Sequence, residues 1–119
     1  QFTPHLIPVN RGILTTLYLA PCQHLSSPEE VTSLGEQISA SYAKAYSNAP
    51  FVRLLEGKAL PDTKNVVGTN VVEIAWRLDP RTGRLIVMSA EDNILKGASG
   101  QAVQSLNLIC GFPETTGLI

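Results

Sequence analysis

The sequence predicts an α+β domain with a mixed, mostly antiparallel β-sheet that is covered by helices on one face. Three observations lead to this prediction. Short segments rich in β-branched and aromatic residues, such as residues 13–19, are typical of strands. Two longer segments space their apolar residues as an amphipathic helix does, and a turn sequence at residues 79–83 separates two strand-like segments. The chain has 119 residues, of which 44% are hydrophobic and 16% charged, so residues 1–119 are expected to form a single domain.

The first part of the chain predicts one extended segment and one strand. Residues 2–9 carry Pro4 and Pro8, which exclude a helix, so we expect an edge strand or an irregular segment there. Residues 10–12 are typical of a turn. Residues 13–19 then predict a strand that is partly buried on both faces.

The strongest local signal is a helix start. Ser27 is suited to the N-cap, Pro28 to the first helical position, and Glu30 can close a capping box. Apolar residues then recur on one helical face, namely Val31, Leu34, Ile38, Tyr42, Ala45 and Tyr46. The other face is polar, so we expect this helix to cover a sheet and to end near residues 47–50.

The middle of the chain predicts strands around a long loop. Residues 51–55 predict a short strand, and residues 70–78 and 84–89 predict a β-hairpin. The intervening loop at residues 56–68 is long for a connection, and long ordered loops often carry function.

The stretch after the hairpin contains the most informative motif. An Asp92-Asn93 pair precedes a helix start that contains Gly97 and Gly100, and the helix should end at Gly111. Glycines allow a close approach of a ligand, and the first amides of a helix can hold a phosphate, a carboxylate or an amide oxygen. Tight packing of a buried helix is the alternative explanation for these two glycines.

Composition excludes several classes of function. The net charge of −1 indicates no nucleic-acid partner and no membrane surface, and there is no membrane-spanning apolar run or signal-peptide pattern. Cys22 and Cys110 each sit beside apolar residues and are expected to be reduced, buried thiols. With His5 and His24 they form no zinc pattern, so we expect no metal site.

Several long motifs, taken together, resemble one enzyme family over nearly the whole chain. They are the segments Phe-Thr-Pro-His-Leu-Ile-Pro-Val-Asn-Arg-Gly-Ile-Leu at 2–14, Pro-Asp-Thr-Lys-Asn-Val-Val-Gly-Thr-Asn at 61–70, Lys-Gly-Ala-Ser-Gly-Gln-Ala-Val-Gln at 96–104 and Gly-Phe-Pro-Glu-Thr-Thr-Gly-Leu at 111–118. In this order they resemble N-acetyl-γ-glutamyl-phosphate reductase, an NADPH enzyme of arginine biosynthesis.

The resemblance implies a domain of a two-domain reductase. The fold would be that of the glyceraldehyde-3-phosphate dehydrogenase C-terminal domain, and the chain would be the substrate and dimerisation domain without its N-terminal Rossmann domain. The family's cysteine nucleophile and catalytic histidine would lie upstream, so no catalytic residue is expected in this chain, which alone should be inactive. NADP(H) would be bound mainly by the absent domain. The parent would act on N-acetyl-glutamyl phosphate in the cytoplasm (in a eukaryote, in a plastid or mitochondrion) and form a homo-oligomer, a dimer or a tetramer.

The resemblance also selects candidate substrate-binding residues. Arg11 is the first candidate for holding an anion, since a guanidinium grips a carboxylate or phosphate bidentately. Lys64 is a second cation, and Lys96 is an alternative at the helix start. His5 and Asn70 are candidates for lining the pocket. For each of them a purely structural role, such as a solvated cation or a turn partner, is the alternative.

Candidate cofactor-binding residues come from the wider dehydrogenase superfamily. There a side-chain amide after the strand fixes the nicotinamide carboxamide, and Asn93 resembles that position. Gly97 and Gly100 would let the helix start sit against the cofactor or the cysteine, whose thiolate a helix start favours. A different class of function is a stand-alone interaction or dimerisation module without catalysis, whose exposed sheet pairs chains.

Overall fold

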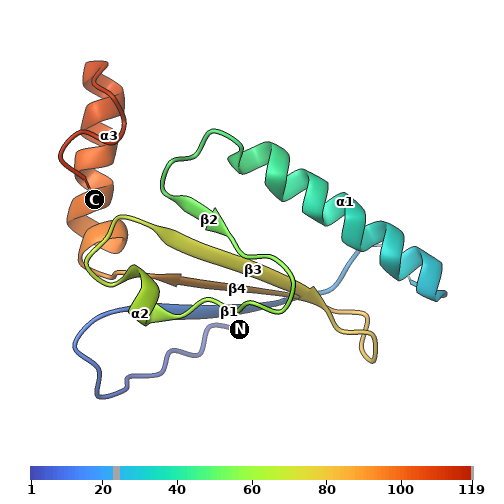
Figure 1. Cartoon of the computed structure of the whole chain (residues 1–119). Coiled ribbons are helices and arrows are strands. Elements are labelled where there is room, and N and C mark those ends of the chain that lie inside the picture. Colours follow the sequence, from blue (N-terminus) through green and yellow to red (C-terminus); the bar gives the residue numbers. More distant parts are fainter. Residues whose placement is uncertain (23–24, 119) are drawn as a thin grey trace.

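The computed structural model describes residues 1–22 and 25–118, and its centre is a four-stranded sheet (Figure 1). The strand order is β1 (Ile13–Leu19), β4 (Leu85–Glu91), β3 (Val72–Leu78) and β2 (Val52–Leu54). β4 pairs antiparallel with both β1 and β3, whereas β2 pairs parallel with β3. The predicted mixed, mostly antiparallel sheet is therefore confirmed.

Helix α1 (Pro28–Tyr46) begins and ends where its sequence predicts. The Ser27 side chain accepts from the Glu30 amide, and the Glu30 carboxylate accepts from the Ser27 amide, so the capping box is complete. α1 runs over one face of the sheet on the β2–β3 side (Figure 1). At Gly35 the helix lies close to the sheet: a Cβ there would be 3.7 Å from the Trp76 ring, an ordinary van der Waals contact.

The N-terminal part decides one open expectation and corrects another. Of the two alternatives for residues 2–9 the irregular segment is found, since prolines at 4 and 8 remove two ladder donors, and the backbone bond found in this segment joins Val9 to Ile7. β1 is not buried on either face: Leu14 is 63% exposed on one face, and Leu17 on the other is also exposed. The reason is that β1 is an edge strand beyond the reach of α1.

The long loop at 56–68 contains a short helix that was not predicted. α2 (Thr63–Val66) begins after Asp62, whose side chain accepts from the Lys64 amide at 3.0 Å. Val66 is fully buried and anchors the loop.

The C-terminal helix starts as a π-helix. In η1 (Leu95–Ser99) the amides of Gly97 and Ser99 donate to carbonyls five residues earlier, at Asp92 and Ile94. α3 (Gly100–Cys110) follows and ends at Gly111, whose left-handed φ of +72° fits the predicted C-terminal glycine. α3 stands at the end of the sheet and projects away from it (Figure 1).

The described apolar core is small. The buried apolar side chains are Phe51, Val66, Ala75, Val87 and Ala90. The chain exposes 8369 Å², whereas a compact monomer of this mass exposes about 6,300 Å². Its radius of gyration is 16.4 Å, against about 13.5 Å for a compact domain. No described helix is both long and apolar enough to cross a bilayer.

Candidate functional site

The centre of the candidate site is the carboxylate of Asp92, directly after β4. Its Oδ2 lies 2.7 Å from Arg11 Nη2 and accepts from the Gly68 amide at 2.7 Å. Its Oδ1 accepts from the amides of Ile94 and Leu95, each at 2.8 Å. Burial by itself would raise the pKa of Asp92, but the Arg11 guanidinium and the three amides outweigh it and hold the pKa well below the usual range.

Asn93 is held beside this carboxylate by one backbone contact. Its Oδ1 accepts from the Gly12 amide at 2.8 Å. Gly12 has a φ of +110°, and a Cβ there would lie 2.8 Å from the Thr63 side chain, so only glycine suits the position. The Asn93 Nδ2 has no partner among the described residues, which leaves an amide donor free for a ligand.

Arg11 lies at the rim of the site. Its side chain is 32% exposed, whereas Asp92 is fully buried. The Nε atom is buried without a hydrogen-bond partner in the described part of the chain. Because Nη2 is bound to Asp92, an anion can bind only to the part of the guanidinium that faces away from Asp92.

A second polar cluster follows around Gln104 of α3. Its Oε1 accepts from Asn70 Nδ2 at 2.9 Å and from Lys96 Nζ at 2.7 Å, and its Nε2 donates to Glu114 at 2.6 Å. Lys96 Nζ also lies 5.7 Å from the centre of the Phe51 ring. Burial lowers the pKa of the Lys96 ammonium, although the charges of Glu114 and Glu91 oppose this.

The two candidate glycines are engaged within the helix start. The amides of Gly97 and Gly100 donate to the carbonyls of Asp92 and Leu95, so neither amide is free for a ligand in this conformation. A Cβ at Gly100 would collide with Asn70 Oδ1 and lie 2.9 Å from Leu95 O. This geometry favours the packing explanation, and a cofactor contact of Gly97 or Gly100 stays a prediction.

The structure thus brings six of the eight candidates to one end of the sheet. Arg11, Asn93 and Gly97 contact Asp92 or its neighbours, and Asn70, Lys96 and Gly100 join them through the Gln104 cluster. His5 is exposed on the irregular N-terminal segment. Lys64 is 77% exposed and pairs with Asp62 at 3.0 Å, so neither residue joins the cluster.

Sequence reasoning missed Asp92 and Gln104 as organising residues. Asp92 stands in the conspicuous Asp-Asn pair, but its partner Arg11 is remote in sequence, so no local pattern joins them. Gln104 belongs to the quoted helix motif, but no pattern in the sequence marked it, because the buried residues of α3 are Gly100, Gln104 and Asn107 whereas its apolar residues are exposed.

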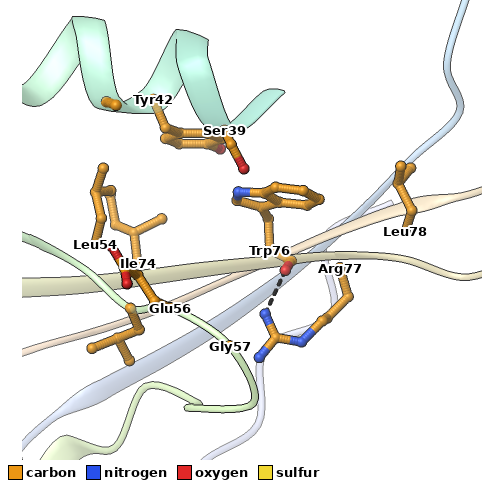
Figure 2. A pocket seen from close by; sticks show the side chains of 11 residues that line it. Ser39, Tyr42, Leu54, Glu56, Gly57, Ile74, Trp76, Arg77 and Leu78 are labelled. Atoms are coloured by element: carbon orange, nitrogen blue, oxygen red, sulfur yellow. Dashed lines mark hydrogen bonds between the residues drawn. The ribbon is translucent and has the colours of Figure 1, made fainter. Parts of the chain in front are cut away.

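A separate hollow of about 470 Å³ lies between α1 and β3. Figure 2 shows Ser39 and Tyr42 of α1 above the Trp76 indole, with Arg77 on the opposite side of the strand. Arg77 donates to the Trp76 carbonyl at 2.6 Å, so this carbonyl of β3 has a hydrogen-bond partner. None of the candidate residues lines this hollow.

Among the described residues, no cluster of His, Cys, Asp and Glu could hold a metal ion. Cys22 and Cys110 are free and exposed, contrary to buried packing but in agreement with the expected reduced state. His24 lies outside the described residues.

The four-stranded mixed sheet, with α1 over one face, is an α+β fold consistent with the glyceraldehyde-3-phosphate dehydrogenase C-terminal domain. A family model described as "Semialdehyde dehydrogenase, dimerisation domain" matches residues 1–93, and the chain belongs to this family.

The chain is also similar to curated bacterial proteins named N-acetyl-gamma-glutamyl-phosphate reductase. The relative from Akkermansia muciniphila is 56% identical over 99% of this chain, and the one from Desulforudis audaxviator is 54% identical over 99%. The relative from Pelobacter propionicus is 48% identical over 98%. The chain spans about a third of the length of these relatives, 32% in each case. The resemblance seen in the sequence is confirmed.

Proposed function

We propose that this chain is the substrate-binding and oligomerisation domain of an NADPH-dependent N-acetyl-γ-glutamyl-phosphate reductase of arginine biosynthesis, working in the cytoplasm. The observation that carries this proposal is the 56% identity to a protein of that name over 99% of the chain. The reaction would be the reductive dephosphorylation of an acyl phosphate to the semialdehyde.

The proposal includes a second domain in the same polypeptide. The relatives' further two thirds of length leave room for a Rossmann domain that carries the dinucleotide site, the cysteine nucleophile and the catalytic histidine. Helix α3 lies beyond the matched residues 1–93 and exposes apolar side chains such as Leu106 and Ile109. This face of α3 would pack on the Rossmann domain.

The residues at the end of the sheet fit one end of a nicotinamide cofactor. The free Nδ2 of Asn93 can donate to the carboxamide oxygen, since its Oδ1 is already held by Gly12. The bound cofactor would supply hydride to the acyl carbon. The described residues offer no Gly-rich phosphate cradle, so the rest of the dinucleotide would lie on the Rossmann domain.

The cations at this end of the sheet fit an anionic substrate. N-acetyl-glutamyl phosphate carries a carboxylate and a phosphate, and the free edge of Arg11 and the ammonium of Lys96 could each hold one of them. His5, Lys64 and Asn70 stay proposed substrate contacts; the first two would need to approach the site when the second domain is present.

The test is an Arg11→Gln substitution in the full-length protein. We expect kcat/KM for the acyl phosphate to fall at least about tenfold, because one charge-assisted hydrogen bond is lost. The matched control is Arg53→Gln, which removes an exposed guanidinium paired with Glu73 away from the site. Oligomer size should be unchanged in both variants. Wild-type activity of the Arg11 variant would contradict its assignment to the substrate.

A further inference from the structure

The side-chain oxygen of Asn93 is held by the Gly12 amide, and the turn that carries Gly12 is in turn held by Asp92. The Gly12 amide reaches Asn93 Oδ1 from the turn before β1. That turn is fixed by its neighbour Arg11, whose Nη2 lies 2.7 Å from Asp92 Oδ2. One contact that orients the Asn93 amide therefore traces back to Asp92.

The backbone conformation at Asn93 is also fixed by the Asp92 carboxylate. Asp92 Oδ1 accepts from the amides of Ile94 and Leu95, the two residues that follow Asn93, and the Asp92 carbonyl accepts from Gly97. Asn93 is thus the one residue between Asp92 and the amides that its side chain holds. The chain cannot rotate there unless these bonds break.

Every polar partner of the Asp92 carboxylate is a donor. Arg11 and the Gly68 amide meet Oδ2, and the amides of Ile94 and Leu95 meet Oδ1. An asparagine at this position would turn its NH₂ group toward one of these donor pairs in either orientation. The residue must therefore be a carboxylate for the turn before β1 and the turn after β4 to hold together.

We propose that Asp92 is a positioning residue for the reaction: without touching the cofactor, it holds the Asn93 carboxamide so that Nδ2 faces the nicotinamide carboxamide. This inference rests on the proposed function, because it takes Asn93 as the contact to the cofactor. The carboxylate acts through the turn that carries Gly12 and through the turn that follows Asn93.

The experiment uses four variants of the full-length protein: Asp92→Asn, Asn93→Ala, their combination, and Glu73→Gln. Glu73 is the matched control, because it is also a buried carboxylate, 2% exposed, and is held by Arg53 and the Asp62 amide. The readouts are the KM for NADPH, the KM for the acyl phosphate, kcat and thermal stability.

We expect Asn93→Ala and Asp92→Asn each to raise the KM for NADPH about fivefold, the value of one lost hydrogen bond. The combined variant should be no worse than Asn93→Ala alone, because Asp92 acts through Asn93. Glu73→Gln should lower thermal stability and leave the KM for NADPH unchanged. The KM for the acyl phosphate should change less than the KM for NADPH in Asp92→Asn.

Several outcomes would overturn this inference. An unchanged KM for NADPH in Asp92→Asn, beside a raised value in Asn93→Ala, removes the inference and leaves the proposed function standing. If the rise in the KM for NADPH of the combined variant equals the product of the two single rises, Asp92 acts independently of Asn93. An unchanged KM in Asn93→Ala removes both the inference and the proposed cofactor contact.

A second variant keeps the inference testable if Asp92→Asn does not fold. Arg11→Lys keeps a positive charge in the turn before β1 but replaces the planar guanidinium that reaches Asp92 by a compact ammonium. It should raise the KM for NADPH, with no added effect in the presence of Asn93→Ala. A KM for NADPH equal to that of the wild type would overturn the inference.

Discussion

Asp92 carries a negative charge at a position that solvent does not reach, and this is possible because four donors surround it. A buried charge without such partners would cost several kcal/mol. The same carboxylate links three segments that are distant in sequence, around Arg11, Gly68 and Leu95. Its energetic role can therefore be separated from its proposed role in positioning Asn93.

The pH dependence of stability tests this energetic role. The pKa of Asp92 is lowered in the folded state, so its stabilising contribution is present above the unfolded pKa near 4 and is lost as the pH falls through the folded pKa. In this chain Asp92→Asn should lower the free energy of unfolding by about 3 kcal/mol at pH 7. The difference from wild type should shrink on acidification below about pH 4.

Urea denaturation of both proteins at pH 7 and in acid measures this difference. Asp62→Asn is the control, because Asp62 is a partly exposed N-cap and asparagine caps a helix about as well as aspartate. A difference between wild type and Asp92→Asn that is constant from neutral to strongly acidic pH would contradict the assignment of a charged, paired carboxylate.

At the scale of elements, the sequence predicted what depends on neighbouring residues. The capping box of α1, its polar outer face and the glycine that ends α3 are local patterns, and all three are confirmed. The π-helix η1, in which the amides of Gly97 and Ser99 donate five residues back, was not predicted, because such helices are rare and the helix-start signals of this segment describe an α-helix. The Asp92 centre was not predicted either, because its partners lie in three segments.

The packing of η1 and α3 against Asn70 gives the next prediction. Gly100→Ala places a methyl group against Asn70 Oδ1 and 2.9 Å from the Leu95 carbonyl, whereas at Gly97 the nearest atom to a new Cβ, Asp92 O, lies 3.4 Å away. Gly100→Ala should therefore lower the free energy of unfolding by about 2 kcal/mol. Gly97→Ala, in the same helix start, should cost clearly less.

Thermal and urea unfolding of the two glycine variants decides between packing and flexibility. If both variants lose the same stability, the close approach of α3 to Asn70 is not what selects glycine at position 100. A loss confined to Gly100→Ala supports the packing explanation and leaves ligand binding by Gly97 as a separate question for the full-length protein.

At the scale of the whole molecule, the exposed surface exceeds that of a compact monomer by roughly 2,000 Å². Specific protein interfaces bury about 800 Å² on each partner, so the excess is enough for more than one contact. Most of the exposed large apolar residues lie in three regions. The irregular segment at 2–9 and the sheet around Leu14 and Tyr18 are within the residues matched by the dimerisation family, and α3 lies beyond them.

This division predicts different effects for two charge substitutions. Leu14→Glu places a carboxylate on the exposed sheet face and should weaken the dimer of this chain at least about tenfold, since a charge would be buried without a partner. Ile109→Glu on α3, where the wild-type side chain is 82% exposed, should leave the dimer intact. In the full-length protein the Ile109 variant should instead lower thermal stability, because α3 would face the second domain.

Light scattering over a range of concentrations measures the mass of this chain and of both variants. A wild-type chain that is strictly monomeric at high concentration would contradict dimerisation through this domain. Dissociation by Ile109→Glu, with Leu14→Glu still dimeric, would instead assign the dimer contact to α3 and leave the sheet face for the proposed second domain. The sheet is favoured because β1 is an uncharged edge strand with apolar side chains exposed on both faces, and such a strand stays unpaired in solution only when charge, proline or a covering element protects it.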